Sequence, residues 1–286
     1  MRSFVRLNNK RMEIFQEGEL GVPILILTGM GCSFEEWFEV TEALSKTNKI
    51  LMFHRPGLGE SEIGEENRTT SRTVKEINEL LNTLQINEPI ILVGHSYGGL
   101  CAQQFTKLYP SKVKTLILVD STSVELGRLD RLEDCSTYAN LDETELKRII
   151  HPVLTENQKK LPLHVQQRLL RFQQTPNLYK AMKSEVENWK ADARIIKKLG
   201  QLPNIPLLVI GRDKKYVIQQ GVEEGLPESE LMLLEETWEQ LIEEQAELSK
   251  SSRLVFAENS GHSVHLDRPD LIIEAVKNLV EDTKSQ

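Results

Sequence analysis

The stretch from Ile90 to Gly99 limits the possible folds more than any other part of the chain. It reads Ile-Ile-Leu-Val-Gly-His-Ser-Tyr-Gly-Gly, four apolar residues followed by a Gly-x-Ser-x-Gly pattern. Four apolar residues are too few for an ordinary helix and are typical of a buried strand. A helix-compatible segment, Leu100 to Tyr109, comes next. The order predicts a strand, a sharp turn that carries Ser96, and a helix.

Small residues two positions before and two positions after Ser96 favour a strained turn. Gly94 and Gly98 would let the strand and the helix pack closely around the serine. The hydroxyl would then point out of the sheet, and the Tyr97 amide at the helix N-terminus would face an anionic intermediate. This is the sequence form of a nucleophile elbow. The pattern alone also fits an ordinary turn, because glycine and serine are common there, so its meaning depends on the rest of the chain.

Strand and helix patterns alternate around this stretch. Segments 3–7 and 11–15 alternate in polarity on either side of Asn8-Asn9-Lys10 and predict an antiparallel hairpin. Apolar runs of the strand type follow at 23–27, 50–53, 113–119 and 206–210, and 253–257 is expected to be the last strand. Most are separated by segments with apolar residues at helical spacing. We therefore predict an α/β fold, with a mostly parallel sheet covered by helices and a hairpin at its start.

The pattern changes between residues 124 and 200. Strand signals disappear, and segments such as 142–150, 163–173 and 177–190 are polar with apolar residues at helical spacing, interrupted by prolines. We expect residues 124–200 to form a helical lid, and residues 1–123 and 201–286 to form the two parts of the core.

A polar stretch, 216–229, and then an acidic helix are expected in the second part of the core. The helix carries Leu231, Leu234, Trp238, Leu241 and Leu248 on one face. Its glutamates are expected to form a solvated face rather than a metal site: Glu235, Glu236, Glu239, Glu243 and Glu244.

Composition excludes several classes of function. The chain has 286 residues, of which 39% are apolar and 27% charged, as in an ordinary globular protein. The net charge of -8 argues against nucleic acid and anionic membranes as partners. Three cysteines at unrelated spacings, Cys32, Cys101 and Cys135, favour reduced thiols and no metal site. No signal peptide and no apolar run of about 18–20 residues is visible, so we expect a cytoplasmic protein without a cofactor. The oligomeric state stays open.

Taken together, these features resemble the α/β-hydrolase fold superfamily, and within it the lidded serine esterases. The resemblance covers nearly the whole chain and rests on four motifs in order. They are the glycine turn Thr28–Gly31, the run Arg55-Pro56-Gly57-Leu58-Gly59-Glu60-Ser61, the elbow Gly94–Gly98, and Gly261-His262 with Arg268-Pro269. The serine comes first and the histidine last, which is the chain order of this fold. The resemblance implies a mostly parallel sheet of the eight-stranded type with a helical lid.

The resemblance implies Ser96 as the nucleophile and His262 as its base. A serine hydroxyl is a poor nucleophile until a base removes its proton. His265 lies three residues further on and is the rival base, but motif position favours His262. The remaining histidines are expected to pack, to line the site or to lie in the lid: His54, His95, His151 and His164.

The acid that orients the histidine is ambiguous in this sequence. Most relatives place it last in a Gly-x-x-Asp pattern after the strand at 206–210. Here Lys214 occupies that place and Asp213 comes one residue early. Some members of the fold place the acid after the preceding strand, which points to Asp120. An aspartate at that strand end can also merely cap a turn. We favour Asp120 and keep Asp213 as the alternative.

The backbone amides of Tyr97 and, by resemblance, Met30 are expected to form an oxyanion hole. The expected function is a serine hydrolase that cleaves a small ester or related acyl substrate through an acyl-enzyme. Alternatives are an aminopeptidase, a lactone hydrolase or a C–C bond hydrolase with the same site, and a ligand-binding protein that keeps the fold without turnover.

Two of these alternatives make demands on the sequence. An aminopeptidase needs a carboxylate pocket for the substrate amine, for which the lid offers Glu185, Glu187 and Asp192, although acidic residues on helices are usually solvated. The ligand-binding alternative is suggested by the displaced Asp213. Haloalkane and epoxide hydrolysis are disfavoured, because those relatives have aspartate where this chain has Ser96.

Overall fold

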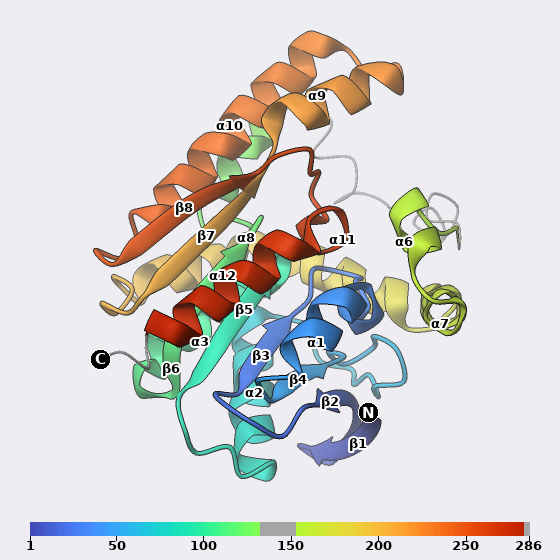
Figure 1. Cartoon of the computed structure of the whole chain (residues 1–286), viewed down its shortest axis with the longest axis vertical. Helices are drawn as coiled ribbons and strands as arrows, with labels where there is room; N and C mark the ends of the chain where they lie inside the picture. The colour runs from blue at the N-terminus through green and yellow to red at the C-terminus, as the bar shows by residue number, and fades with distance from the viewer. Residues whose placement is uncertain (132–152, 283–286) are drawn as a thin grey trace.

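An eight-stranded sheet forms the centre of the molecule (Figure 1) in a computed structural model that describes residues 1–131 and 153–282. The strands are β1 (Arg2–Leu7), β2 (Lys10–Glu17), β3 (Ile24–Leu27), β4 (Ile50–Phe53), β5 (Ile90–His95), β6 (Val113–Val119), β7 (Leu207–Arg212) and β8 (Ser252–Ala257). Their order is β1-β2-β4-β3-β5-β6-β7-β8. Strand β2 pairs antiparallel with β1 and β4, and the other pairs are parallel. The predicted fold class and the hairpin at its start are confirmed.

Helices cover both faces of the sheet (Figure 1). The helical elements are η1 (Phe34–Trp37), α1 (Phe38–Leu44), α2 (Thr70–Thr83), α3 (Tyr97–Leu108), η2 (Pro110–Lys112), η3 (Leu126–Arg131), α6 (Glu156–Lys160), α7 (Leu163–Gln173), α8 (Leu178–Lys198), α9 (Lys214–Glu223), α10 (Glu228–Ala246), α11 (Val264–Asp267) and α12 (Pro269–Asp282). Helices α1 and α12 pack on one face, whereas α2, α3 and α10 pack on the other. Strands buried on both faces need apolar residues at every position, which explains continuous runs such as Ile24–Leu27.

The described helices between β6 and β7 lie over the loops that follow β3 and β4. A Cβ built at Gly31, after β3, would lie 2.6 Å from Sδ of Met182 on α8. A Cβ built at Gly57, after β4, would lie 2.7 Å from Cβ of Ala181, also on α8. The expected helix at 142–150, with Cys135 and His151 nearby, lies outside the described residues. The division into a core and a lid stays a prediction.

Helices α9 and α10 form a hairpin between β7 and β8 (Figure 1). Helix α9 occupies much of the stretch 216–229, which the sequence marked only as polar. Its helical periodicity is weak because Gly221, against which Leu231 of α10 packs, is its buried position. Among all the described helices, none is long and apolar enough to cross a membrane.

Candidate active site

Ser96 lies on a strained turn between β5 and α3. Its backbone has φ 51° and ψ -124°, a conformation that residues other than glycine rarely adopt. The Ser96 amide donates to the carbonyl of Val119, which fixes the turn against the end of β6. A Cβ at Gly98 would lie 2.7 Å from the carbonyl oxygen of Thr28, so only glycine allows this approach. The predicted strand, turn and helix are confirmed, with the serine at the turn.

Three side chains that the sequence placed far apart meet at this turn. Nε2 of His262, in the loop between β8 and α11, lies 3.0 Å from Oγ of Ser96. Nδ1 of His262 donates to Oδ2 of Asp120 over 2.5 Å. Asp120 directly follows β6 and is fully buried, whereas 41% of the His262 side chain is exposed. The structure therefore brings Ser96, His262 and Asp120 into one hydrogen-bonded chain that opens to solvent at the histidine.

All the polar contacts of the Asp120 carboxylate favour its ionised form. Oδ1 accepts the Arg212 amide at 3.2 Å and the indole N–H of Trp238 at 2.8 Å. Oδ2 accepts Nη1 of Arg212 at 3.3 Å in addition to His262. Burial by itself raises the pKa of Asp120, but the Arg212 charge and the hydrogen bond from His262 lower it to about 2. The group stays a carboxylate and an acceptor at neutral pH.

The alternative acid, Asp213, has a different set of partners. Its Oδ1 accepts the amides of Lys215 at 2.9 Å and Tyr216 at 3.3 Å, so Asp213 is the N-cap of α9. Its Oδ2 accepts the Asn259 amide at 3.0 Å. These contacts are those of a helix cap, and the carboxylate that meets His262 is Asp120.

The other histidines make packing contacts, and two of them, His95 and His265, are buried. His265 stacks on Trp37 with ring centroids 4.5 Å apart, and burial lowers its pKa to about 3. Nε2 of His95 donates to the His262 carbonyl at 2.9 Å, and burial lowers the pKa of His95 well below its usual value. His164 packs edge-on against Phe38, with ring centroids 5.9 Å apart. None of these contacts involves Ser96.

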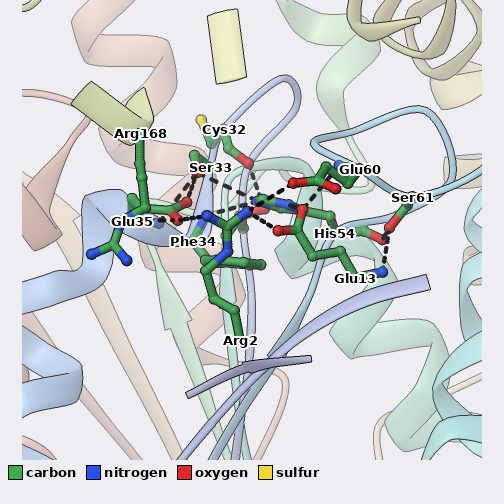
Figure 2. A network of polar contacts seen from close by, with 11 residues as sticks. Arg2, Glu13, Cys32, Ser33, Phe34, Glu35, His54, Glu60, Ser61 and Arg168 are labelled. Atoms are coloured by element: carbon green, nitrogen blue, oxygen red, sulfur yellow. Dashed lines mark hydrogen bonds and ion pairs between the residues drawn. The ribbon is translucent and has the colours of Figure 1, made fainter. Parts of the chain in front are cut away.

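His54 belongs to a polar network with Glu13 and Phe34 (Figure 2). Nε2 of His54 accepts the Phe34 amide at 3.2 Å, so Nδ1 carries the proton and donates to Glu13 at 2.8 Å. The ring stacks on Phe34, and burial lowers the pKa of His54 to about 3. The open choice between lining the site and packing is resolved in favour of packing.

The two expected oxyanion donors lie on neighbouring segments. Tyr97 is the first residue of α3, so its amide is one of the helix N–H groups that lack an acceptor within the helix. Met30 follows Gly29, and a Cβ at Gly29 would lie 3.2 Å from Cβ of Ser96. The glycine turn therefore lies directly beside the serine. A Cβ at position 29 would also lie 3.0 Å from Nδ1 of His95 and 3.2 Å from Sγ of Cys32, so even a small side chain would be tightly packed here.

Arg55 donates hydrogen bonds to the backbone of this glycine turn. Its side chain is buried, and it donates to the carbonyls of Thr28 at 2.8 Å and Gly29 at 2.9 Å. Its Nε donates to Glu185 of α8 at 2.6 Å. Its guanidinium carbon lies 5.2 Å from the centre of the Tyr97 ring. The sequence marked Arg55 only as part of a motif, and its link to both expected oxyanion donors was missed.

Three acidic residues that were expected to be solvated are buried, each about 1% exposed: Glu185, Asp192 and Glu235. Glu185 pairs with Arg55, and Glu235 pairs with Arg212 through Nε at 2.8 Å. Asp192 accepts the amide of the first residue of α2. Each partner lies far away in the chain, so the helical pattern that predicts a solvated face could not reveal it.

Cys32 and Cys101 are free thiols. Burial raises the pKa of Cys101 to about 12, so it stays protonated and packs as a small apolar residue. Within 1–131 and 153–282, no group of three or more His, Cys, Asp or Glu side chains could hold a metal ion.

Comparisons with known proteins agree with this fold. The family model described as the alpha/beta hydrolase fold matches residues 22–149. An AB hydrolase superfamily protein from Gibberella zeae is 26% identical over 91% of this chain and 86% of its own length. The solved structure of Est816, titled an N-acyl homoserine lactone degrading enzyme, superposes with a TM-score of 0.70 at 18% identity, covering 96% of this chain and 99% of that one. A thermophilic esterase from Thermogutta terrifontis gives 0.65 at 17% identity, covering 99% and 98%. With the sheet order, the elbow and these likenesses together, the chain has the α/β-hydrolase fold.

Proposed function

We propose that this protein is a serine hydrolase that cleaves a small ester or related acyl substrate through an acyl-enzyme. The observation that carries the proposal is the continuous chain from Ser96 through His262 to Asp120, with contacts of 3.0 and 2.5 Å. A serine at hydrogen-bond distance from a histidine that is itself oriented by a carboxylate is the arrangement that activates a hydroxyl for attack on a carbonyl.

Each residue has one role in the proposed reaction. Oγ of Ser96 attacks the substrate carbonyl carbon while Nε2 of His262 takes the hydroxyl proton. The amides of Met30 and Tyr97 stabilise the resulting oxyanion. His262 then gives its proton to the leaving alcohol, which departs as the acyl-enzyme forms. A water molecule repeats the sequence, with His262 as its base, and releases the acid and free Ser96.

The site and similar solved structures support the proposed substrate class. Ester and lactone carbonyls both undergo this attack, and the titles of similar structures include an esterase and a lactone-degrading enzyme. Each of those chains is under 20% identical to this one, so the choice between the two classes is part of the proposal. The partner is accordingly a small acyl compound.

Two alternatives lose their support. The aminopeptidase alternative relied on lid carboxylates, but Glu185 pairs with Arg55 and Asp192 accepts a backbone amide. Glu187 pairs with Lys183 on the same helix at 2.9 Å. The ligand-binding alternative rested on the displaced Asp213, whereas Asp120 contacts His262 instead.

A fluorophosphonate probe tests the proposal. Purified protein is expected to be labelled at one site, with labelling lost in Ser96→Ala and slowed while an excess of an ester substrate is present. Hydrolysis of p-nitrophenyl esters of increasing chain length would then identify the preferred acyl size. Labelling that persists in Ser96→Ala would reject Ser96 as the nucleophile.

A further inference from the structure

Arg212 lies between two buried carboxylates that belong to different elements. It is the last residue of β7, and its guanidinium contacts Oδ2 of Asp120 through Nη1 at 3.3 Å. The same guanidinium binds Glu235 of α10 in a two-point contact, with Nε to Oε2 at 2.8 Å and Nη2 to Oε1 at 2.5 Å. The side chains of Asp120, Arg212 and Glu235 are 0%, 11% and 1% exposed. The three charges are therefore largely removed from water.

Trp238, one turn after Glu235, completes the cluster. Its indole N–H donates to Oδ1 of Asp120 at 2.8 Å, and the guanidinium carbon of Arg212 lies 4.3 Å from its ring centre. Its ring also meets the His262 ring edge-on, with centroids 5.7 Å apart. The tryptophan thus occupies Oδ1 and leaves Oδ2 directed at the histidine. All of these contacts converge on the one carboxylate that touches His262.

We propose that Arg212 and Glu235 are positioning residues that together set the charge acting on His262 through Asp120, and so set the pH at which the Ser96–His262 pair becomes active. The inference rests on the proposed serine-hydrolase function and deepens it. It assigns to Glu235 a role for which neither the motif nor the helical pattern gave any sign.

The physical argument is a balance of three charges. The carboxylate of Asp120 contacts His262, and a nearby negative charge favours the charged form of a base. Arg212 weakens that stabilisation, and Glu235 restores part of it by neutralising Arg212. Charges at this burial are poorly screened by salt or water, so each acts over several ångströms.

Other titratable groups around the histidine leave this balance in place. His95 of β5 and His265 of α11 are buried and neutral, because burial lowers both of their pKa values.

On the α9–α10 side, Lys214 pairs with Glu239 at 2.5 Å and so forms a neutral pair. Asp267 of α11 accepts the Gly261 amide at 2.8 Å, and Asp213 caps α9. Arg212 contacts Asp120 directly, and Glu235 contacts Arg212.

The test measures two quantities as a function of pH: kcat/KM for p-nitrophenyl butyrate hydrolysis and the rate of fluorophosphonate labelling. Two variants are compared, and their pH profiles are expected to shift in opposite directions. The acid limb is the part of each profile in which the rate rises with pH. Glu235→Gln leaves the positive charge of Arg212 without its neutralising partner, so the acid limb of both profiles is expected to move to lower pH by about half to one unit. Arg212→Met removes the positive charge, so the limb is expected to move to higher pH by a similar amount. Damage to the fold would lower activity without producing shifts of opposite sign.

Two further variants keep the test interpretable. Arg212→Met leaves Glu235 buried without a partner, so the double variant Arg212→Met/Glu235→Leu removes both charges and is expected to shift the limb to higher pH by less than Arg212→Met. Arg212→Lys keeps the positive charge, so its acid limb is expected to lie closer to the wild-type position than that of Arg212→Met. Circular dichroism at each pH shows that the variants remain folded.

The outcomes separate the two proposals. Wild-type protein that is not labelled at Ser96 overturns the serine-hydrolase function itself. A second outcome overturns only the roles of Arg212 and Glu235. In that outcome the wild-type protein is labelled and active, but the acid limbs coincide in all variants or move in the same direction in Glu235→Gln and Arg212→Met.

Discussion

Two buried arginines lie on either side of the nucleophile elbow and do different work. Arg55, just after β4, binds one carboxylate, Glu185, and two backbone carbonyls of the glycine turn. Arg212, at the end of β7, binds two carboxylates, Asp120 and Glu235. The first cluster carries no net charge, whereas the second carries one negative charge.

The difference shows what each cluster can influence. A neutral pair that is saturated with hydrogen bonds ties segments together, so Arg55 joins the glycine turn to helix α8. A cluster with a net charge also affects the ionisation of neighbouring groups. Arg212 therefore acts on His262, through Asp120. We therefore expect changes on the Arg55 side to appear mainly as lost stability and changes on the Arg212 side mainly as altered catalysis.

The largest expected effect is on catalysis and lies on the Arg212 side. Asp120→Asn keeps the shape of the acid but presents an amide to His262, which favours the wrong tautomer, so kcat is expected to fall by about 10⁴-fold. Asp213→Asn is the matched control, because asparagine also caps helices well. Its kcat is expected to stay within a few-fold of wild type in a p-nitrophenyl ester assay. If Asp213→Asn loses more turnover than Asp120→Asn, Asp120 is the wrong acid.

The next effect is on stability and lies on the Arg55 side. Arg55→Met leaves Glu185 buried and unpaired, which typically costs about 3–5 kcal/mol of unfolding free energy. The double variant Arg55→Met/Glu185→Leu removes both charges and is expected to recover most of that loss. Urea denaturation of the three proteins measures both values. A single variant as stable as wild type would contradict the tethering role.

The smallest expected effect separates hydrogen bonding from charge within the Arg212 cluster. Trp238→Phe keeps an aromatic ring over Arg212 but removes the N–H that donates to Asp120. A hydrogen bond to a charged group contributes about 1.5–3 kcal/mol, so kcat is expected to fall by roughly 10- to 100-fold. The acid limb of the pH profile is expected to move much less than in Glu235→Gln, because no formal charge changes. A limb shift as large as that of Glu235→Gln would mean that the hydrogen bond, rather than the charge, sets the profile.

Local patterns predicted the elements of this fold well. Parallel strands buried on both faces need continuous apolar runs, and Ile24–Leu27 and Ile90–Val93 show them plainly. The elbow was also readable, because the close approach at Gly98 requires glycine. Helix α9 was harder to recognise, since a helix with one buried position has little apolar periodicity to detect.

The sequence by itself determined which residues have the chemistry of the site: Ser96, His262 and a choice of two aspartates, Asp120 and Asp213. Motif spacing carries this information because the turn and the strand ends are local features. Only the tertiary structure shows which aspartate contacts His262, since β6, β7 and the loop after β8 converge there from distant parts of the chain. It also decided that Glu185 and Glu235 are buried. A buried carboxylate needs a cation or hydrogen-bond donors as partners, and Arg55 and Arg212 reach these two through space, not along the helix.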